Sequence, residues 1–588
     1  MDTTSEPLEE WLTSFAKRIR RLTGWTGNPF VIFPLFLLCV WAIFNWSLTI
    51  GSIIKDYNPL PVWDYWQVAQ HLERYKALDL SVFWIQHNEH RIVFPEAVFA
   101  ADMLFFHGHQ IFSLVVSFCC YFGVWVVLAW TFNSDKSVSP VIRKVGILLA
   151  AVVIGWQGSS VVVGNTFLLQ WTMLEFTVVL SLALLAASRK SSNLFYLGSA
   201  IVAAVVATFS SANGILLWPI LIAAALLLRI PKLHLLGLAV SAAVTISLYF
   251  RGFHTTNELQ WLNIVEHPIY FIGFVSSYLS MPMGALGQPV AAVGFGAFNL
   301  LSFLSLLVLA ARKNLLASTP AIVLFGSFVF AFATAAITTA GRMNLSDPNF
   351  LAALAARYVT LPLVNWAVLV LVLLWISARL KWELLSPSAI SILACLCLTG
   401  LTSSLHPWIT GNGSFIADQQ VATISVENGL LDPVFEQKLY PDPGFATSML
   451  PVLRRNDVAI YSGTPELSWL GKRAGSLFGS CSERQQGKVS SVVPVQGGFE
   501  VVGPVSSTHA PKVVFVDERS RIVGFGEEVN AGVPAAIAQT PADGQRYWVG
   551  FINSRYGSKS FSTYLVSHHG AAICPIEQSR NLQGMRSR

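Results

Sequence analysis

Residues 61–91, PVWDYWQVAQHLERYKALDLSVFWIQHNEHR, gather an unusual number of ionisable side chains. Charged residues make up only 12% of the 588-residue chain, yet this stretch holds Asp64, Glu73, Glu89 and Arg91 together with three histidines. Ionisable groups beside or inside an apolar environment are costly and are usually kept for a function. We therefore expect the functional site of the protein to include this stretch.

The first half of the stretch has the pattern of an amphipathic helix. The rings of Trp63 and Trp66 are of the kind found at the level of lipid headgroups. We interpret this half as a helix lying on a membrane surface, with Asp64 near its N-terminal end. Its apolar positions recur at helical spacing, at Tyr65, Val68, Leu72 and Tyr75.

The composition of the whole chain indicates a membrane protein. It is 54% hydrophobic with a mean hydropathy of +0.56, and many segments approach the ~20 apolar residues needed to cross a bilayer. The net charge of +6 lies in short basic runs between apolar segments, as topology signals do, and not on one soluble domain that would bind nucleic acid. No cleavage-site pattern precedes the first apolar run, so we expect no cleaved signal peptide.

The distribution of basic residues predicts how the chain crosses the membrane. Residues 1–28 carry a basic run and are expected in the cytoplasm. The loop 55–108 then lies outside. Residues 92–106 are short and interrupted by Pro95, so we expect a surface or half-inserted helix there. A full span at 92–106 would place the basic loop 133–144 outside, against the positive-inside bias.

On this reasoning the fold is a polytopic α-helical membrane domain, residues 29–405, with its N-terminus cytoplasmic. Residues 268–287 are rich in Ser, Gly, Met and Pro and are expected to form a re-entrant or surface element. About eleven transmembrane helices are expected, near 29–54, 109–132, 145–163, 166–187, 194–209, 213–228, 233–250, 289–310, 318–340, 358–378 and 387–405.

The composition changes near residue 406. Residues 406–588 are rich in Gly, Pro, Ser and Val and contain short β-like runs, which predicts a β-rich domain on the outer side of the membrane. Cys481 and Cys574 lie in this polar region, and an oxidising compartment permits a disulfide between them.

On the expected topology, unusual polar residues converge on the outer side. A carboxylate there can accept a proton from an acceptor hydroxyl. Arginines can donate paired hydrogen bonds to a leaving phosphate as its charge grows. This combination is what sugar transfer from a lipid phosphate needs. The residues concerned are Asp64, His87, Glu89, His90, Arg91, Arg251, Arg342, Arg357 and Tyr358.

The order of these features resembles the GT-C superfamily of polyprenyl-phosphate-sugar-dependent membrane glycosyltransferases. The resemblance rests on an early Asp in a long outer loop, two surface helices, about eleven spans and an outer C-terminal domain, and it covers roughly residues 30–378. Asp64 is followed by Tyr65 and Trp66 where the family often has a second acid, so a divalent metal is not favoured. Short motifs also resemble a group of bacterial membrane proteins: WDYW at 63–66, QHNEHRIVFPEAVFAAD at 86–102, SSANGILLWP at 210–219, GR at 341–342 and ARY at 356–358.

The resemblance implies an enzyme of the bacterial inner membrane with a periplasmic C-terminal domain. It would move a sugar from a polyprenyl-phosphate donor to a glycan, lipid or protein acceptor, among membrane lipids, without a cofactor. Asp64 would be the general base. The cluster His87, Glu89, His90 and Arg91 would shape the donor and acceptor positions. Arg251, Arg342, Arg357 and Tyr358 would bind substrate, with Arg342 and Arg357 on the phosphate.

Other interpretations stay open. The same features also fit a transporter or flippase of lipid-linked sugars, or a non-catalytic component of an envelope-polysaccharide complex. Asp64 is also a good helix cap, and residues 87–91 also fit a polar staple between helices. Gln170 and Glu175 fit interhelical hydrogen bonds as well as a substrate site.

Overall fold

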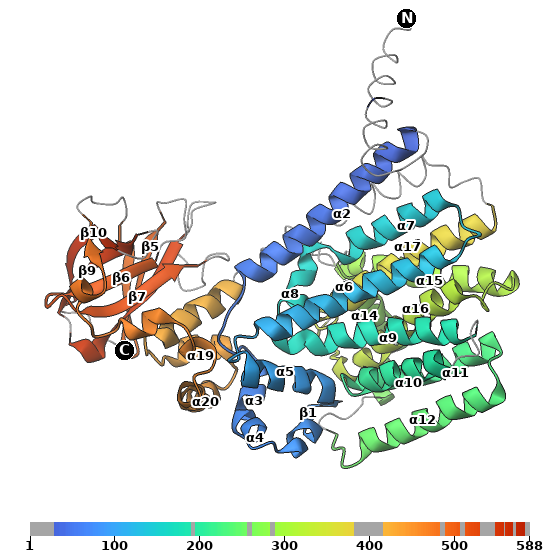
Figure 1. Cartoon of the computed structure of the whole chain (residues 1–588), viewed down its shortest axis with the longest axis horizontal. Helices are drawn as coiled ribbons and strands as arrows, with labels where there is room; N and C mark the ends of the chain where they lie inside the picture. The colour runs from blue at the N-terminus through green and yellow to red at the C-terminus, as the bar shows by residue number, and fades with distance from the viewer. Residues whose placement is uncertain are drawn as a thin grey trace, which may run out of the picture. The chain divides into compact units, whose positions relative to one another are not determined.

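The computed structural model describes residue 14 and residues 29–189, 194–255, 261–282, 289–347, 349–381, 415–481, 488–505, 512–529, 547–557, 559–567 and 572–582. The chain divides into two compact units. The helical unit comprises Met1–Ile54, Phe83–Ala97 and Leu114–Trp408, and the mixed unit comprises Lys55–Val82, Val98–Ser113 and Ile409–Arg588. Long helices dominate the first and a β-sheet the second (Figure 1).

The helical unit is a bundle of long, mostly apolar helices. A short hairpin of β1 (Gln86–His87) and β2 (His90–Arg91) belongs to it, and α5 (Val93–Phe105) runs from this unit into the mixed unit. Its other described helices are α2 (Pro29–Lys55), α6 (Ile111–Ser134), α7 (Pro140–Ile154), α8 (Ser160–Val163), α9 (Leu169–Ser188), α10 (Leu194–Thr208), α11 (Leu217–Leu228), α12 (Lys232–Phe250), α13 (Trp261–Glu266), α14 (Pro268–Ser280), α15 (Pro289–Arg312), α16 (Thr319–Arg342) and α17 (Thr360–Arg379).

Seven described helices are long and apolar enough to cross a membrane, or eight if α7 and α8, bent by 49°, count as one broken span. Eleven spans were expected. Two of the expected spans coincide with shorter apolar helices, Leu194–Thr208 and Ala212–Leu228. The expected span 387–405 lies outside the described residues. The helical unit is therefore that of a membrane-embedded protein.

Local sequence explains where several of these helices begin and break. The Ser139 hydroxyl accepts a hydrogen bond from the Ile142 backbone N–H, and Pro140 occupies the first turn of α7, where a missing N–H costs nothing. Ser318 caps α16 in the same way. Gly155 ends α7, where a Cβ would meet the Trp46 ring. The polar and small residues of the loops thus set the helix ends.

Helices α9 and α17 form the interior of the bundle. In their apolar windows 78% and 83% of the residues are buried, against 28% for α2 and 22% for α12. The side chains of α9 and α17 therefore face protein, whereas those of α2 and α12 are largely on the surface. A polar residue on α9 or α17 consequently needs a partner inside the protein or a ligand.

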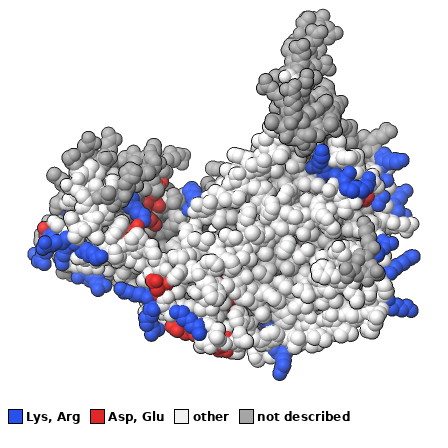
Figure 2. Space-filling model, in the orientation of Figure 1, with Lys and Arg blue, Asp and Glu red and all other residues white. Residues whose placement is uncertain are grey.

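The helical unit has two chemically different ends. At one end, which we call the basic end, the residues after α6 and α9, those before α16 and the last residue of α17 line one cavity. Helices α16 and α17 therefore carry Arg342 and Tyr358 at their opposite end, which we call the hairpin end. Lysines and arginines lie along the right-hand edge of this unit in Figure 2, and the face turned to the viewer carries few charged residues.

The mixed unit begins with short helices around the aromatic residues of the 61–91 stretch. Tyr65 and Trp66 are buried, and the Tyr65 ring packs edge-on against Phe99. The helices are α3 (Tyr65–Gln70), α4 (Leu72–Lys76), α19 (Pro433–Leu439) and α20 (Pro443–Arg455), with residues 415–427 also helical.

The region expected to be β-rich from residue 406 thus has helices in its first part. Asp432 and Asp442 cap α19 and α20 through their side chains, each followed by a proline in the first turn. This Asp-Pro pairing is a helix-start signal that the composition-based prediction did not use.

The rest of the mixed unit is an eight-stranded sheet in the order β3-β10-β9-β6-β7-β8-β5-β4, antiparallel except for β3 and β10. Phe515, Trp548 and Phe561 are buried in one cluster, and Phe525 packs with Trp469 in another. The strands are β3 (Gly479–Ser480), β4 (Ser491–Val495), β5 (Gly498–Pro504), β6 (Lys512–Asp517), β7 (Ile522–Glu528), β8 (Tyr547–Asn553), β9 (Ser560–Val566) and β10 (Ala572–Asn581).

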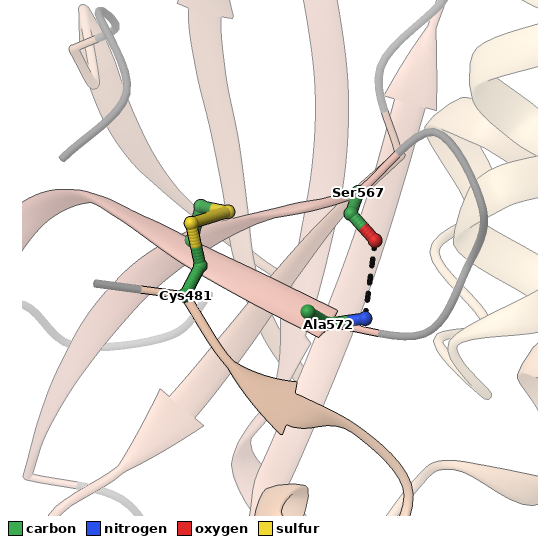
Figure 3. The surroundings of a disulfide bond; sticks show 4 residues. Cys481, Ser567 and Ala572 are labelled. Carbon is green, nitrogen blue, oxygen red and sulfur yellow. Dashed lines mark hydrogen bonds between the residues drawn. A yellow bond between two sulfur atoms is a disulfide. The ribbon is translucent and has the colours of Figure 1, made fainter. Parts of the chain in front are cut away.

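Cys481 and Cys574 form the disulfide expected from the sequence, with their Cα atoms 4.8 Å apart (Figure 3). Cys481 follows β3 and Cys574 lies on β10, so the bond joins the only parallel pair of described strands. Beside it, the Ala572 backbone N–H donates to the Ser567 hydroxyl at 3.1 Å. The disulfide thereby fixes one edge of the sheet.

Candidate functional site

The HNEHR sequence forms a tight hairpin at the hairpin end of the helical unit. His87 pairs with His90 across β1 and β2. Asn88 in the turn has φ of 49°, a left-handed conformation that asparagine tolerates better than most residues. The Gln86 side chain accepts a hydrogen bond from the His254 backbone N–H at 3.0 Å. The hairpin is therefore tied to the segment that follows α12.

Arg91 is used by the fold. It is only 2% exposed, and its guanidinium donates to the carbonyls of Trp84, Tyr249 and Arg251 at 2.5, 2.7 and 2.7 Å. The same group lies over the Trp84 ring, 5.0 Å from its centroid. Arg91 thus joins the hairpin to the C-terminal end of α12. This geometry favours the staple interpretation of Arg91 over the expected role in substrate binding.

His90 is held as a neutral imidazole. The Ala212 backbone N–H lies 3.2 Å from its Nδ1, which makes Nδ1 the acceptor and leaves the proton on Nε2. Burial is the main reason that the pKa of His90 falls to about 4; His87 and Arg342 lower it further, while Glu89 opposes them. His87 itself is buried and packs against Phe167 with 4.7 Å between ring centroids. His90 is therefore held by a hydrogen bond from the Ala212 backbone, and His87 by ring packing against Phe167.

Three arginines predicted to bind substrate are exposed at this end: Arg251, Arg342 and Arg357. Arg342 is the last residue of α16 and acts electrostatically on His90. Arg357 precedes α17, with its guanidinium 5.1 Å from the centroid of the Tyr358 ring. Neither Arg342 nor Arg357 makes a side-chain hydrogen bond or ion pair with any residue that the structure describes. Their donors are available to an anionic ligand.

Tyr358 lies at the centre of an aromatic group below Arg357. It is 4% exposed, and its ring centroid is 5.0 Å from that of Tyr278 and 5.9 Å from that of Trp171. The Tyr278 hydroxyl is buried without a hydrogen-bond partner among the described residues. Tyr358 is therefore packed among aromatic rings at the hairpin end and is not an exposed side chain.

Glu175 lies deeper in the bundle, on α9. It is 2% exposed, and its Oε1 accepts a hydrogen bond from the Thr360 hydroxyl at 2.7 Å. Its Oε2 and the side-chain oxygen of Gln170 are buried and have no hydrogen-bond partner in the described parts of the chain. The interhelical hydrogen bond expected for Glu175 is present, but among the described residues only one of its two carboxyl oxygens has a partner.

Asp64 belongs to the mixed unit and is half-buried. It occupies the N-cap position of α3, yet its side chain makes no capping hydrogen bond. The preceding Trp63 has φ of 52° and donates its backbone N–H to the Leu439 carbonyl. Side-chain capping of α3 therefore does not account for an aspartate at position 64.

Within the described residues, no group of three or more His, Cys, Asp or Glu side chains is arranged to hold a metal ion. Comparisons with protein-family models, with curated proteins and with solved structures found no match for this chain.

Sequence reasoning missed two aromatic members of the hairpin end, Trp171 and Tyr278. Both lie within apolar helices, where an aromatic residue is normally part of the core. Trp171 directly follows Gln170, and a polar residue in an apolar span is the signal that draws attention to its neighbours.

Proposed function

We propose that the protein is a membrane glycosyltransferase that moves a sugar from a polyprenyl-phosphate donor to an acceptor on the side of the hairpin end. The observation that carries this proposal is the pair Arg342 and Arg357. Both are exposed at the same end of an apolar helical bundle, without a side-chain hydrogen bond or ion pair to a described residue. A lipid phosphate is the ligand whose charge and location match such arginines.

The proposed roles follow from the chemistry of the step. As the bond between the sugar and the phosphate breaks, negative charge grows on the phosphate, and the two guanidinium groups stabilise it. For Asp64, which lies in the mixed unit, the role of taking the proton from the acceptor hydroxyl rests on the sequence resemblance alone. The hairpin, held by Arg91, positions His90 with its Nε2–H as a donor. Arg251, exposed at the end of α12, contributes a further positive charge.

The proposal is tested by measuring sugar transfer with the purified full-length protein and a panel of polyprenyl-phosphate sugars. Asp64→Asn should fold normally and lose about 10²–10⁴-fold in rate, because an amide cannot act as general base. Asp79→Asn is the matched control: Asp79 lies in the same segment and is occupied by an exposed ion pair with Arg74, which contributes little.

A folded Asp64→Asn protein with near-normal turnover would remove Asp64 from the mechanism. Absence of transfer by the wild type with every donor and acceptor class would reject the function itself. An equal loss in Asp64→Asn and Asp79→Asn would point to damage of the segment and not to lost base catalysis.

A second function is favoured by Glu175. A carboxyl group in the buried interior of the bundle, with one oxygen that has no partner among the described residues, is a feature of proteins that move a polar substrate through the membrane. Movement of a lipid-linked sugar across liposomes containing the protein, without any covalent transfer, would support a flippase in place of a transferase.

A further inference from the structure

A polar cavity lies at the basic end of the helical unit, at the opposite ends of α16 and α17 from Arg342 and Tyr358. It has a volume of about 310 Å³, at the lower end of the about 300–1,000 Å³ typical of small-molecule sites. The side chains that matter to the argument are Ser134, Asp135, Arg189, Ser318, Thr319 and Arg379. These come from four separate helix ends, so the cavity exists only in the folded bundle.

Arg379 supplies the first positive charge. Its Nε lies 3.3 Å from Asp135 Oδ2, but is not aligned for a hydrogen bond. Its guanidinium carbon is 5.9 Å from the centroid of the Trp375 ring. No residue within the described ranges accepts a hydrogen bond from its guanidinium nitrogens. Arg379 is thus held in place with its donors still available.

Arg189 supplies the second positive charge. It follows α9, is exposed, and donates one hydrogen bond to the Ala317 carbonyl. That bond places the guanidinium beside the loop that leads into α16. Its remaining N–H groups make no hydrogen bond to a described residue. Two guanidinium groups from different helices therefore line the same cavity.

Asp135 balances only one of these charges. Its Oδ1 accepts from the Ser137 backbone and hydroxyl, and its Oδ2 accepts from the Trp375 indole at 2.9 Å. Burial alone would raise the pKa of the Asp135 carboxyl, but these hydrogen bonds and the charge of Arg379 hold it below its ordinary value. Asp135 is therefore ionised, and with two arginines the cavity keeps a net positive charge.

The start of α16 adds a neutral donor group to the cavity through the Thr319 hydroxyl. The hydroxyls of Ser134 and Ser318 also line the cavity, but they donate to the carbonyls of Thr131 and Leu315. Helix α16 has 24 residues, so the partial positive charge at its N-terminus strengthens the attraction for an anion. Two fork-shaped guanidinium groups and the Thr319 hydroxyl in one cavity match the tetrahedral oxygens of a phosphate better than they match a flat carboxylate.

We propose that this cavity binds a phosphate group, carried either by the headgroup of an anionic phospholipid or by a small water-soluble phosphate. Both sources present the same chemistry to Arg189 and Arg379. Basic pockets between transmembrane helices are known to take lipid headgroups. The site is distinct from the hairpin end and does not depend on the proposed sugar transfer.

The test measures binding to the purified full-length protein in a zwitterionic detergent, with three probes. These are inorganic phosphate, a short-chain phosphatidic acid and a phosphatidylcholine of the same chain length. Arg189→Gln and Arg379→Gln should each weaken binding of the phosphate-bearing probe about tenfold, which corresponds to about 1.4 kcal/mol. Asp135→Asn should tighten it, because the opposing charge is removed while the amide oxygen still accepts from Trp375.

Arg312→Gln is the matched control, since Arg312 is an exposed arginine at the end of α15 that does not line the cavity. It should leave binding unchanged. Binding of phosphatidic acid alone assigns the site to a headgroup, whereas binding of both anionic probes assigns it to soluble phosphates. If Arg379→Gln does not fold, Arg189→Gln and Asp135→Asn decide. No binding by the wild type, equal binding of phosphatidylcholine, or equal affinities in all variants would overturn the proposal.

Discussion

At the hairpin end Arg91 donates to three backbone carbonyls, whereas at the basic end Arg379 faces one carboxylate and keeps donors available. Arg342 and Arg357, also at the hairpin end, have neither kind of partner among the described residues. The difference depends on what surrounds each guanidinium. Carbonyls at a helix C-terminus occupy the N–H donors of a nearby arginine. An arginine at a helix end that is exposed on the surface keeps its donors for a ligand.

The largest effect, on the free energy of unfolding, should come from removing Arg91, whose guanidinium is bonded to three carbonyls. Arg91→Ala leaves three carbonyls without their donor in a buried place, and we expect a loss of about 3–5 kcal/mol in the free energy of unfolding. Arg342→Ala should cost under about 0.5 kcal/mol, since it breaks no such contact. Thermal or denaturant-induced unfolding of the two variants in detergent solution measures the difference. Equal losses would contradict the division between structural and available arginines.

The next effect is a pH dependence that belongs to the hairpin end alone. In the folded protein the pKa of His90 is lowered to about 4 by burial, from the ordinary 6.5. The unfolded chain therefore binds the proton more readily, and stability is lost as pH falls from about 6.5 towards 4, by up to roughly 3 kcal/mol.

His90→Asn removes the titrating group, and its amide oxygen can replace Nδ1 as the acceptor for Ala212. It should flatten the stability profile between pH 4 and pH 6.5, while the exposed His254→Asn should leave it as in the wild type. The same slope in His90→Asn and the wild type would show that other groups cause the dependence.

A smaller effect is expected on donor binding. Arg342→Ala and Arg357→Ala should each weaken the affinity for a polyprenyl phosphate about tenfold, as loss of a charge-assisted contact does. The pair of substitutions should add, if each guanidinium holds a different oxygen. Titration of the lipid phosphate onto the purified variants measures this, with Arg312→Ala, from the basic end, as the control. Unchanged affinity in the double variant would detach these arginines from the donor.

The smallest effect is expected for Glu175→Gln, at the buried carboxyl of α9. Glu175→Gln keeps an oxygen that accepts the Thr360 hydroxyl, so it should change stability by less than about 1 kcal/mol. Glu175→Ala leaves a cavity and should cost about 2–3 kcal/mol. Loss of function in a stable Glu175→Gln protein would favour the transport interpretation, because only the ionisable group is then missing.

The helices were largely predictable because long apolar runs between basic loops define spans without any knowledge of packing. The helices α19 and α20 were not expected, although Asp432-Pro433 and Asp442-Pro443 mark their starts. The prediction used the composition averaged over 406–588, in which the β-like runs outweigh these two local helix-start signals.

The candidate site was predictable only as a set of residue types. Sequence indicated that His90, Arg91 and Arg342 deserve a role, but not that Arg91 meets the Tyr249 carbonyl, 158 positions away. Likewise, nothing in the sequence indicated that the side chains of Asp135 and Arg379 lie in contact. Which arginine is consumed and which is available depends on these long-range contacts, which no local pattern encodes.

The central claim is that the free arginines of the hairpin end hold the donor phosphate during sugar transfer. One measurement tests it most directly: the transfer rate of the purified protein at saturating and limiting donor, for the wild type, Arg342→Ala/Arg357→Ala and Arg312→Ala. We predict that the double variant loses about 10²-fold in kcat/KM, while Arg312→Ala transfers sugar as the wild type does. A double variant as active as the wild type, or an equal loss in Arg312→Ala, would contradict the account.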